Sequence, residues 1–310
     1  MRRLLPLLLL AACASPAPKP AATPTTPAPP GSTVLAKIRV GGEPCGVAAA
    51  AGAVWVTDAR GARLVRVAGG RVTGTTKVDA TPCEIATGFG ALWVVTQSGR
   101  LDRVDPRTGR VTARIPVGQT SYEAVAAFGH VWVTNRDGNS VSKVDPRTNR
   151  VVATIATPFV NAGGIAATKD ALWVGNDAGG DTTLRRLDPR THALTKVTAG
   201  TRPAFVAVAG ETVFVANEQD GTVTRLDATG RALGTVAAGR SPVNLAVVGG
   251  DVWVPDDQGN VLTRIDARTG AVTETLPVGA GPAVVAADGA DVLVTCLGEG
   301  TVWRVRPAPR

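Results

Sequence analysis

A short apolar run with a bulky residue at its centre recurs along the chain and constrains the fold more than any other feature. The central residues of successive copies are 38, 39, 41, 41, 39 and 40 positions apart. The seven centres are Trp55, Trp93, Trp132, Trp173, Phe214, Trp253 and Leu293. Copies of about forty residues predict an all-β fold, a seven-bladed β-propeller in which each blade has four antiparallel strands.

Each copy shows the same order of strands and turns. A strand of small residues comes first, and in five copies a proline such as Pro44 opens it, eleven residues before the centre. The Val-Trp-Val run follows as the second strand, and it is apolar on both faces, as expected between neighbouring blades. A third strand leads through a tight turn, such as Asp-Pro-Arg-Thr-Asn at 145–149, to a fourth strand. We therefore interpret the Trp series as core between blades.

The two ends of the repeat region predict how the ring closes. The seventh copy ends after its third strand, at 302–305, and so lacks a fourth. Residues 34–40 have the pattern of a fourth strand and belong to no other copy. We expect them to complete the seventh blade, because this pairing leaves no open edge between the first and last blades.

Residues 1–12 have the pattern of a secretory signal peptide. Arg2 and Arg3 precede a short apolar stretch, which is followed by small residues. The sequence Leu-Ala-Ala-Cys at 10–13 resembles the bacterial lipobox, so we predict that Cys13 is lipidated and anchors the protein to a bacterial membrane. The alternative is an ordinary signal peptide with a chance cysteine. We expect an extracytoplasmic location, in the periplasm or at the cell surface.

Residues 13–33 follow as a segment rich in Pro, Ala and Thr. They hold seven prolines and show no apolar periodicity. Such a composition favours an extended chain without a core, which is typical of a tether. The propeller is then expected over 34–310.

Candidate binding residues lie where the chain passes from one blade to the next. These loops share a face of the ring with the loops between second and third strands, and loops on a rigid scaffold usually carry function. Near the axis the residue types vary while the surrounding sequence repeats. We predict a polar pocket with one aromatic wall, formed by Glu84, Tyr122, Glu123, Arg202, Phe205, Arg240 and Asn244. The alternative is solvated loop residues and caps of free backbone groups.

Two cysteines stand at the same position of adjacent copies. Cys45 and Cys83 each follow a proline, and such a pair is a reasonable disulfide in an oxidising compartment if the two Cα atoms lie within about 7 Å. Cys296 is either free or competes for Cys45. Two carboxylates, Glu84 and Glu123, without a nearby histidine are a weak signal for a metal, so we expect no metal or other cofactor.

The chain is basic, with a formal net charge of +8. Its arginines gather around the turns between third and fourth strands, a distribution that would suit nucleic acid or acidic lipid. Aspartates in the same turns weaken this field. We therefore expect no nucleic-acid binding, and we expect membrane contact through the lipid anchor only.

The repeat Asp-Pro-Arg-Thr-Gly-Arg-Val, followed by Ile-Pro-Val-Gly and Val-Trp-Val-Thr-Asn, resembles the YncE-like, YVTN-repeat family of bacterial propellers over roughly 34–306. It is also similar to the streptogramin (virginiamycin B) lyase group. The first resemblance implies members with DNA-binding or peptidoglycan-linked roles. The second implies a catalytic histidine with a glutamate and magnesium on the loop face. Because His130 and His192 fall on the opposite face here, we do not transfer the lyase activity.

Sequence motifs of common catalytic sites are missing from the chain: it has no nucleophile elbow, phosphate loop, dinucleotide fingerprint or zinc-protease helix motif. Our leading hypothesis is a membrane-anchored lipoprotein that binds a small molecule, a cell-wall ligand or a protein partner without catalysis. A metal-assisted lyase or hydrolase using Glu84 and Glu123 is the first alternative. Binding of nucleic acid or an acidic polymer is the second.

Overall fold

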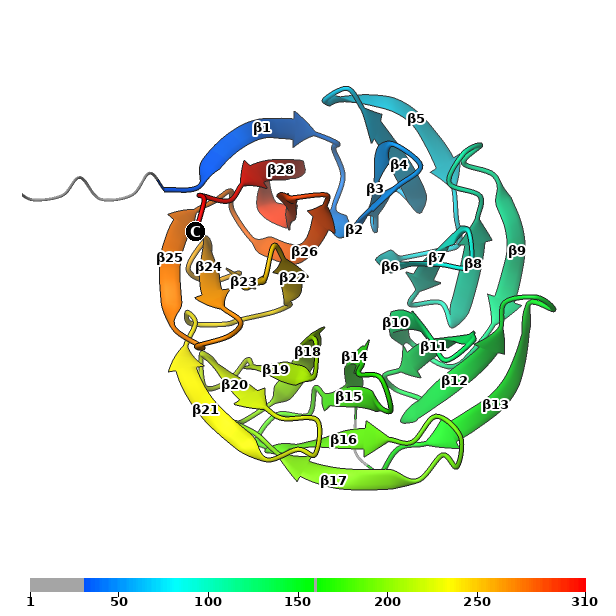
Figure 1. Ribbon diagram of the computed structural model, residues 1–310. Helices are drawn as coiled ribbons and strands as arrows, with labels where there is room; N and C mark the ends of the chain where they lie inside the picture. Colours follow the sequence, from blue (N-terminus) through cyan, green and yellow to red (C-terminus); the bar gives the residue numbers. More distant parts are fainter. Residues whose placement is uncertain (1–30, 159–160) are drawn as a thin grey trace, which may run out of the picture. The chain divides into compact units, whose positions relative to one another are not determined.

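The computed structural model describes residues 31–158 and 161–310. They belong to one compact unit, and the predicted signal peptide, Cys13 and most of the tether lie outside the described residues. Seven four-stranded antiparallel sheets form a ring around a central axis (Figure 1), which confirms the seven-bladed propeller. In the described part of the chain, a single 3-10 turn at Leu297–Glu299 is the only helical element, and no helix is long and apolar enough to span a membrane.

The strands that surround the axis and their neighbours carry the core. The innermost strands are β2 (Pro44–Ala50), β6 (Pro82–Gly88), β10 (Ser121–Ala127), β14 (Ala162–Ala167), β18 (Pro203–Ala209), β22 (Ala246–Val248) and β26 (Pro282–Asp288). The second strands are β3 (Ala53–Asp58), β7 (Ala91–Thr96), β11 (His130–Asn135), β15 (Leu172–Asn176), β19 (Thr212–Asn217), β23 (Asp251–Asp256) and β27 (Asp291–Cys296).

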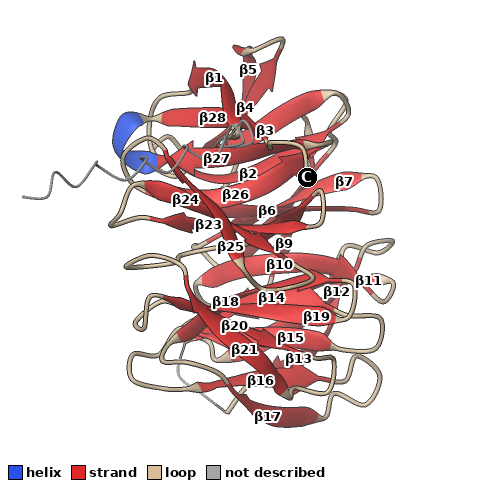
Figure 2. Ribbon diagram, turned by 60° about the vertical axis from the view of Figure 1, so that its left-hand side comes forward, coloured by secondary structure: helices blue, strands red, loops and turns tan. Residues whose placement is uncertain are grey.

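The outer half of each blade follows the same order (Figure 1), and Figure 2, coloured by secondary structure, shows strands joined by loops throughout the ring. The third strands are β4 (Arg63–Ala68), β8 (Arg100–Val104), β12 (Ser140–Asp145), β16 (Thr183–Leu187), β20 (Thr222–Leu226), β24 (Val261–Asp266) and β28 (Thr301–Arg306). The outermost strands are β5 (Arg71–Lys77), β9 (Val111–Pro116), β13 (Arg150–Ala156), β17 (Leu194–Thr198), β21 (Ala232–Ala237), β25 (Val272–Pro277) and β1 (Thr33–Arg39).

The first strand of the chain closes the ring by pairing with the last. β1 runs antiparallel to β28, from Thr33 opposite Arg306 to Arg39 opposite Thr301. Figure 1 shows β1 outside β28 at the rim. Ile38 is 7% exposed and packs in a cluster that joins blade 1 to blade 7. The predicted closure of the seventh blade is confirmed.

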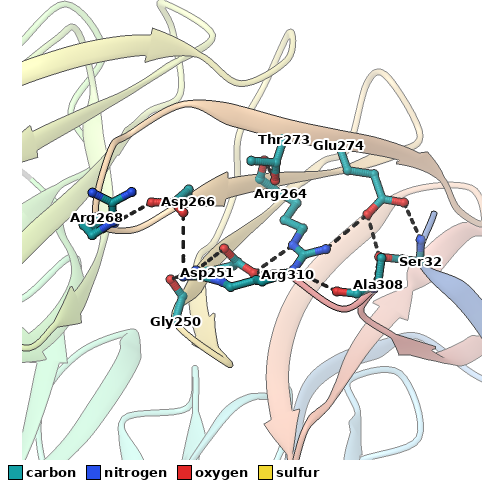
Figure 3. Close-up of polar contacts among 10 residues, drawn as sticks. All are labelled: Ser32, Gly250, Asp251, Arg264, Asp266, Arg268, Thr273, Glu274, Ala308 and Arg310. Atoms are coloured by element: carbon teal, nitrogen blue, oxygen red, sulfur yellow. Dashed lines mark hydrogen bonds and ion pairs between the residues drawn. The ribbon is translucent and has the colours of Figure 1, made fainter. Parts of the chain in front are cut away.

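A polar network fastens both ends of the described chain to the sixth blade (Figure 3). The backbone N–H and hydroxyl of Ser32 donate to the carboxylate of Glu274 on β25. The backbone N–H of Ala308 donates to the Ser32 hydroxyl at 3.1 Å. Arg264 of β24 donates to the carbonyl of Ala308 and pairs with the buried Asp251 at 2.6 Å. The closing strand is thus held by side chains of a neighbouring blade as well as by its own ladder.

Each central tryptophan lies between two blades, and four of the five have a cation from the third strand of their own blade over the ring. Trp93 is fully buried and stands opposite Arg103, whose guanidinium lies 5.1 Å from the ring centroid. The same guanidinium donates to the carbonyl of Pro146, in the tight turn of the next blade, at 2.8 Å. The contact from a third-strand cation to the next turn recurs at Lys143, Arg186 and Arg225. Arg264 makes the corresponding contact to Ala308, which follows β28 in the seventh blade. The interpretation of the Trp series as core between blades is confirmed.

We predict that the closing strand determines the stability of the whole ring. Ile38→Ala should lower the free energy of unfolding by about 2–4 kcal/mol, because it removes buried apolar volume. Leu35→Ala on the same strand is the control, since that side chain is 44% exposed and its loss should cost less than about 0.5 kcal/mol. Deleting 34–40 should abolish the cooperative transition in urea followed by circular dichroism. A deletion variant that unfolds like the full chain would show that closure is dispensable.

Candidate functional site

A pocket of about 270 Å³ opens at the axis on one face of the ring. We call this the pocket face; it carries the loops between blades and the loops between second and third strands. The opposite face carries the tight turns, and we call it the turn face. All seven blades contribute lining residues. The size lies near the lower end of the range of small-molecule sites.

Four of the seven predicted residues line this pocket, namely Glu84, Tyr122, Arg202 and Phe205. Glu123, Arg240 and Asn244 do not line it. The carboxylate of Glu123 lies behind the lining, against Gly164 of the fourth blade, where an added Cβ would come within 2.6 Å of its Oε2.

The two remaining predicted residues have structural contacts. Arg240 is exposed, and its backbone N–H donates to Asp256 at 2.8 Å. Asn244 is buried, and its side-chain oxygen accepts from the backbone N–H of Val285 at 3.3 Å. Asn244 thus caps a backbone group of the next blade, which agrees with the alternative that these residues cap free backbone groups.

A bulge in the innermost strands turns the lining side chains toward the axis. The register of β6 against β7 shifts between Pro82 and Ile85, so Cys83 and Glu84 leave the regular ladder. Equivalent shifts occur in β2, β10, β14, β18 and β26. Bulges redirect side chains and are frequent beside active sites. The position of the pocket therefore follows from a backbone feature that every copy but the sixth repeats.

A threonine two positions after the aromatic centre stabilises this bulge. The Thr57 hydroxyl accepts from the backbone N–H of Gly46 at 2.7 Å and lies 2.7 Å from the carbonyl oxygen of Cys83 in the next blade. Thr295 forms the same bridge from the seventh blade to the carbonyl of Cys45 at 2.8 Å. These hydroxyls fix the backbone that carries both cysteines.

The two cysteines predicted as a pair meet at the pocket wall. Their Sγ atoms are 2.7 Å apart, and both side chains are thiols in this structure. Contact with the Cys83 thiol, followed by burial, raises the pKa of Cys45 well above its usual range. Cys296 is a separate, buried thiol. The geometry places Cys45 and Cys83 where only a small movement would form a disulfide.

We predict that Cys45 and Cys83 form this disulfide in protein isolated from an oxidising compartment. Intact mass should be two hydrogen atoms below that of the reduced chain, and reduction should lower the free energy of unfolding by about 3–4 kcal/mol because a closed loop of this length is released. Cys45→Ser and Cys83→Ser should lower stability equally, and the double variant no further. A Cys296→Ser control should keep the mass difference; its loss there would assign the bond to another pair.

Two carboxyl groups interact at the wall of the pocket, Glu84 in the lining and Glu123 behind it. Burial raises the pKa of Glu84 from its ordinary value near 4.5 to about 8. Burial, and next the charge of Glu84, raise the pKa of Glu123 well above its usual range. The Oε2 atom of Glu123 is buried without a hydrogen-bond partner among the described residues. With a pKa of about 8, Glu84 is mainly protonated at neutral pH and presents a carboxylic acid to the pocket.

We predict that this pair makes the propeller less stable as the pH rises. A raised pKa means that the folded state holds a proton that the unfolded chain releases, so stability falls between about pH 4.5 and pH 8. Glu84→Gln should flatten this decline by roughly 2–4 kcal/mol over the interval. Urea unfolding at a series of pH values measures the effect, and Glu211→Gln on an exposed turn is the control. Parallel curves for wild type and Glu84→Gln would contradict the assignment.

The rim of the pocket is held by an ion network that sequence reasoning did not find. Arg136 and Arg202 each contact the buried carboxylate of Asp177 at 2.7 Å. Arg202 also binds Glu218 at 2.9 Å, and the guanidinium of Arg136 lies 5.3 Å from the ring centroid of Tyr122. Tyr122 in turn lies 5.8 Å, centroid to centroid, from Phe205. The aromatic wall is thus two rings with an arginine over one of them.

These charged residues were missed because they stand one position after a row of polar residues that belong to the loop itself. The third residue after the aromatic centre accepts hydrogen bonds from backbone N–H groups in four copies, at Asp58, Asn176, Asn217 and Asp256. Asp58, for example, accepts from Glu43 and Gly61 at 3.0 Å. The fourth residue points into the pocket, and this row includes Arg136, Asp177, Glu218, Asp257 and Leu297. The sequence signal was available, because the third position is polar in most copies while the fourth varies.

The two histidines lie at the turn face, away from the pocket. His130 begins β11, and its Nδ1 lies 2.9 Å from the carbonyl oxygen of Phe128. His130 and His192 both contact Trp132 edge-on, with ring centroids 6.2 and 6.1 Å away. Both imidazoles therefore belong to the packing around one interblade tryptophan.

Comparison with known proteins places the chain by its fold. No family model matches the sequence. No curated protein matches it either. Solved structures do match it. Hydrazine synthase of Kuenenia stuttgartiensis is similar with a TM-score of 0.74 and 16% sequence identity, over 86% of this chain and 96% of that one. A streptogramin B lyase is similar with a TM-score of 0.74 and 14% identity, over 86% of this chain and 93% of that one. A catalytically inactive virginiamycin B lyase from Staphylococcus aureus with quinupristin is similar with a TM-score of 0.75 and 15% identity, over 85% of this chain and 94% of that one. What they share is the propeller. At these identities the resemblance to the lyase group is confirmed for the fold alone.

Proposed function

We propose that this protein is an extracytoplasmic propeller, held at a bacterial membrane by a lipidated Cys13, that binds a small ligand or a segment of a partner in its axial pocket without catalysis. The observation that carries the proposal is the pocket itself. Seven blades converge on it, and it offers apolar and polar side chains within one small volume. This combination is the usual composition of a binding site.

Polar groups in the pocket lining that lack a partner within the protein support the binding of a ligand there. Among the described residues the Tyr122 hydroxyl makes no hydrogen bond, although it lines the pocket. Arg136 uses its guanidinium for one carboxylate contact and the Tyr122 ring, and is otherwise open to the pocket. Phe205, Val243 and Val284 add apolar surface to the same lining. A ligand that has both hydrogen-bond acceptors and an apolar group fits this arrangement.

The metal-assisted lyase that the sequence left open rests on the Glu84 and Glu123 pair. The two carboxyl groups do interact, since the charge of Glu84 raises the pKa of Glu123. Both histidines, however, lie on the turn face against Trp132. A proton-transfer partner of the type implied by the lyase resemblance is therefore not at the pocket, and we favour binding.

We predict that ligands found by screening envelope metabolites and cell-wall fragments raise the melting temperature through this pocket. At a ligand concentration about 100-fold above the dissociation constant, the free energy of unfolding should rise by about 2.7 kcal/mol. Arg202→Ala and Phe205→Ala should abolish the shift, and Arg240→Ala, outside the pocket, should keep it. A shift that survives both pocket variants would place the binding elsewhere, and turnover of the ligand by wild type would contradict the non-catalytic role.

A further inference from the structure

Two phenylalanines are exposed at turn tips on the turn face. Phe89 is 45% and Phe128 36% exposed, and they are the only aromatic residues among the exposed large hydrophobic side chains of the described chain. They occupy the same turn, between first and second strands, in the adjacent second and third blades. The turns are close, because a Cβ at Gly88 would lie 2.3 Å from the Cβ of Ala126.

Both residues adopt a backbone conformation that bulky side chains avoid. The φ angle is +51° at Phe89 and at Phe128, and each is followed by a glycine with positive φ. The fifth, sixth and seventh blades place glycine at this position, as Gly210, Gly249 and Gly289. A large residue with positive φ is an outlier that the fold does not require. An exposed aromatic ring kept at such a site is consistent with a contact outside the chain.

The part of the turn face around the two rings is positively charged. In the turns between third and fourth strands, blades 1 to 3 carry five exposed arginines against two aspartates, a net of +3: Arg71, Arg107, Arg110, Arg147 and Arg150 against Asp105 and Asp145. Blades 4 to 6 carry three of each and are neutral there: Arg190, Arg231 and Arg268 with Asp188, Asp227 and Asp266. We call the turns of blades 1 to 3, with both phenylalanines, the basic aromatic sector.

The tether joins the propeller on this same face. β1 is an outermost strand, and it runs from the turn face, at Thr33, to the pocket face, at Arg39. Ser32 is held there by Ala308, which follows the end of β28. The first described residues of the chain therefore lie at the turn face.

We propose that the basic aromatic sector docks on the surface of an anionic lipid bilayer, with Phe89 and Phe128 inserted among the headgroups. Exposed aromatic rings bordered by arginine are the features with which peripheral proteins hold an anionic membrane. The sequence predicted contact through the anchor only, and the sector adds a second contact. The axial pocket then faces away from the bilayer. This proposal does not depend on what the pocket binds.

Flotation with vesicles tests the docking. The protein starts at residue 13 and carries Cys13→Ser, so neither the leader nor an acyl chain contributes; the vesicles are phosphatidylcholine with or without phosphatidylglycerol. We expect binding only with phosphatidylglycerol and a steep loss with salt. Phe89→Gly with Phe128→Gly should weaken binding by at least about tenfold while the melting temperature stays equal or rises, because glycine suits positive φ. A loss of binding therefore could not be ascribed to unfolding.

Matched variants make the outcome decisive. Val152→Ser removes an exposed apolar residue from β13 and should leave vesicle binding unchanged. Arg107→Glu with Arg147→Glu should remove the preference for phosphatidylglycerol, and Arg268→Glu in the neutral part should not. Arg202→Ala in the pocket should bind vesicles like wild type. Equal binding to both vesicle types, full binding by the double glycine variant, or no binding by wild type would overturn the proposal.

Discussion

The contact between a buried tryptophan, a cation of its own blade and a turn carbonyl of the next blade is the constraint on which this propeller depends. A tryptophan buries about 150–250 Å², or roughly 4–6 kcal/mol of transfer free energy at 25 cal/mol per Å². The cation over its ring satisfies a carbonyl that the sheet ladder leaves open, as Arg103 does at Pro146. One repeated unit thus supplies both the apolar and the polar part of each interface. It also gives a structural role to several of the basic residues, such as Arg103 and Lys143.

The pocket depends on the same repetition, and its specificity depends on departures from it. Every copy but the sixth shifts register in its innermost strand, and this bulge aims side chains at the axis whatever their chemistry. Threonines such as Thr57 stabilise the bulge in some blades, and in others the position is free to vary. The scaffold is therefore periodic, while the lining differs in every blade. A pocket of this kind can change its ligand without any change in the ring.

The sequence predicted the parts of the structure that repeat and was less informative about those that do not. The number of blades, the burial of the tryptophans and the closure by 34–40 all follow from spacing and periodicity. Glu84, Tyr122, Arg202 and Phe205 were placed at the axis because strand order fixes which loops meet there. Arg136 and Asp177 were missed because one residue decides whether a side chain caps a loop or points into the pocket. Phe89 was missed because its turn looks ordinary until its backbone angle is known.

Ring closure by the first strand has a consequence for how the protein matures. The strand made earliest, β1, has its partner β28 at the very end of the chain, more than 260 residues later. Until the last blade emerges, β1 has no ladder to join and the first blade presents an open edge. Long-range pairing of this kind is slow and leaves strands exposed to wrong partners. A chain of this design would need protection from its neighbours from the synthesis of its first strand until the ring closes.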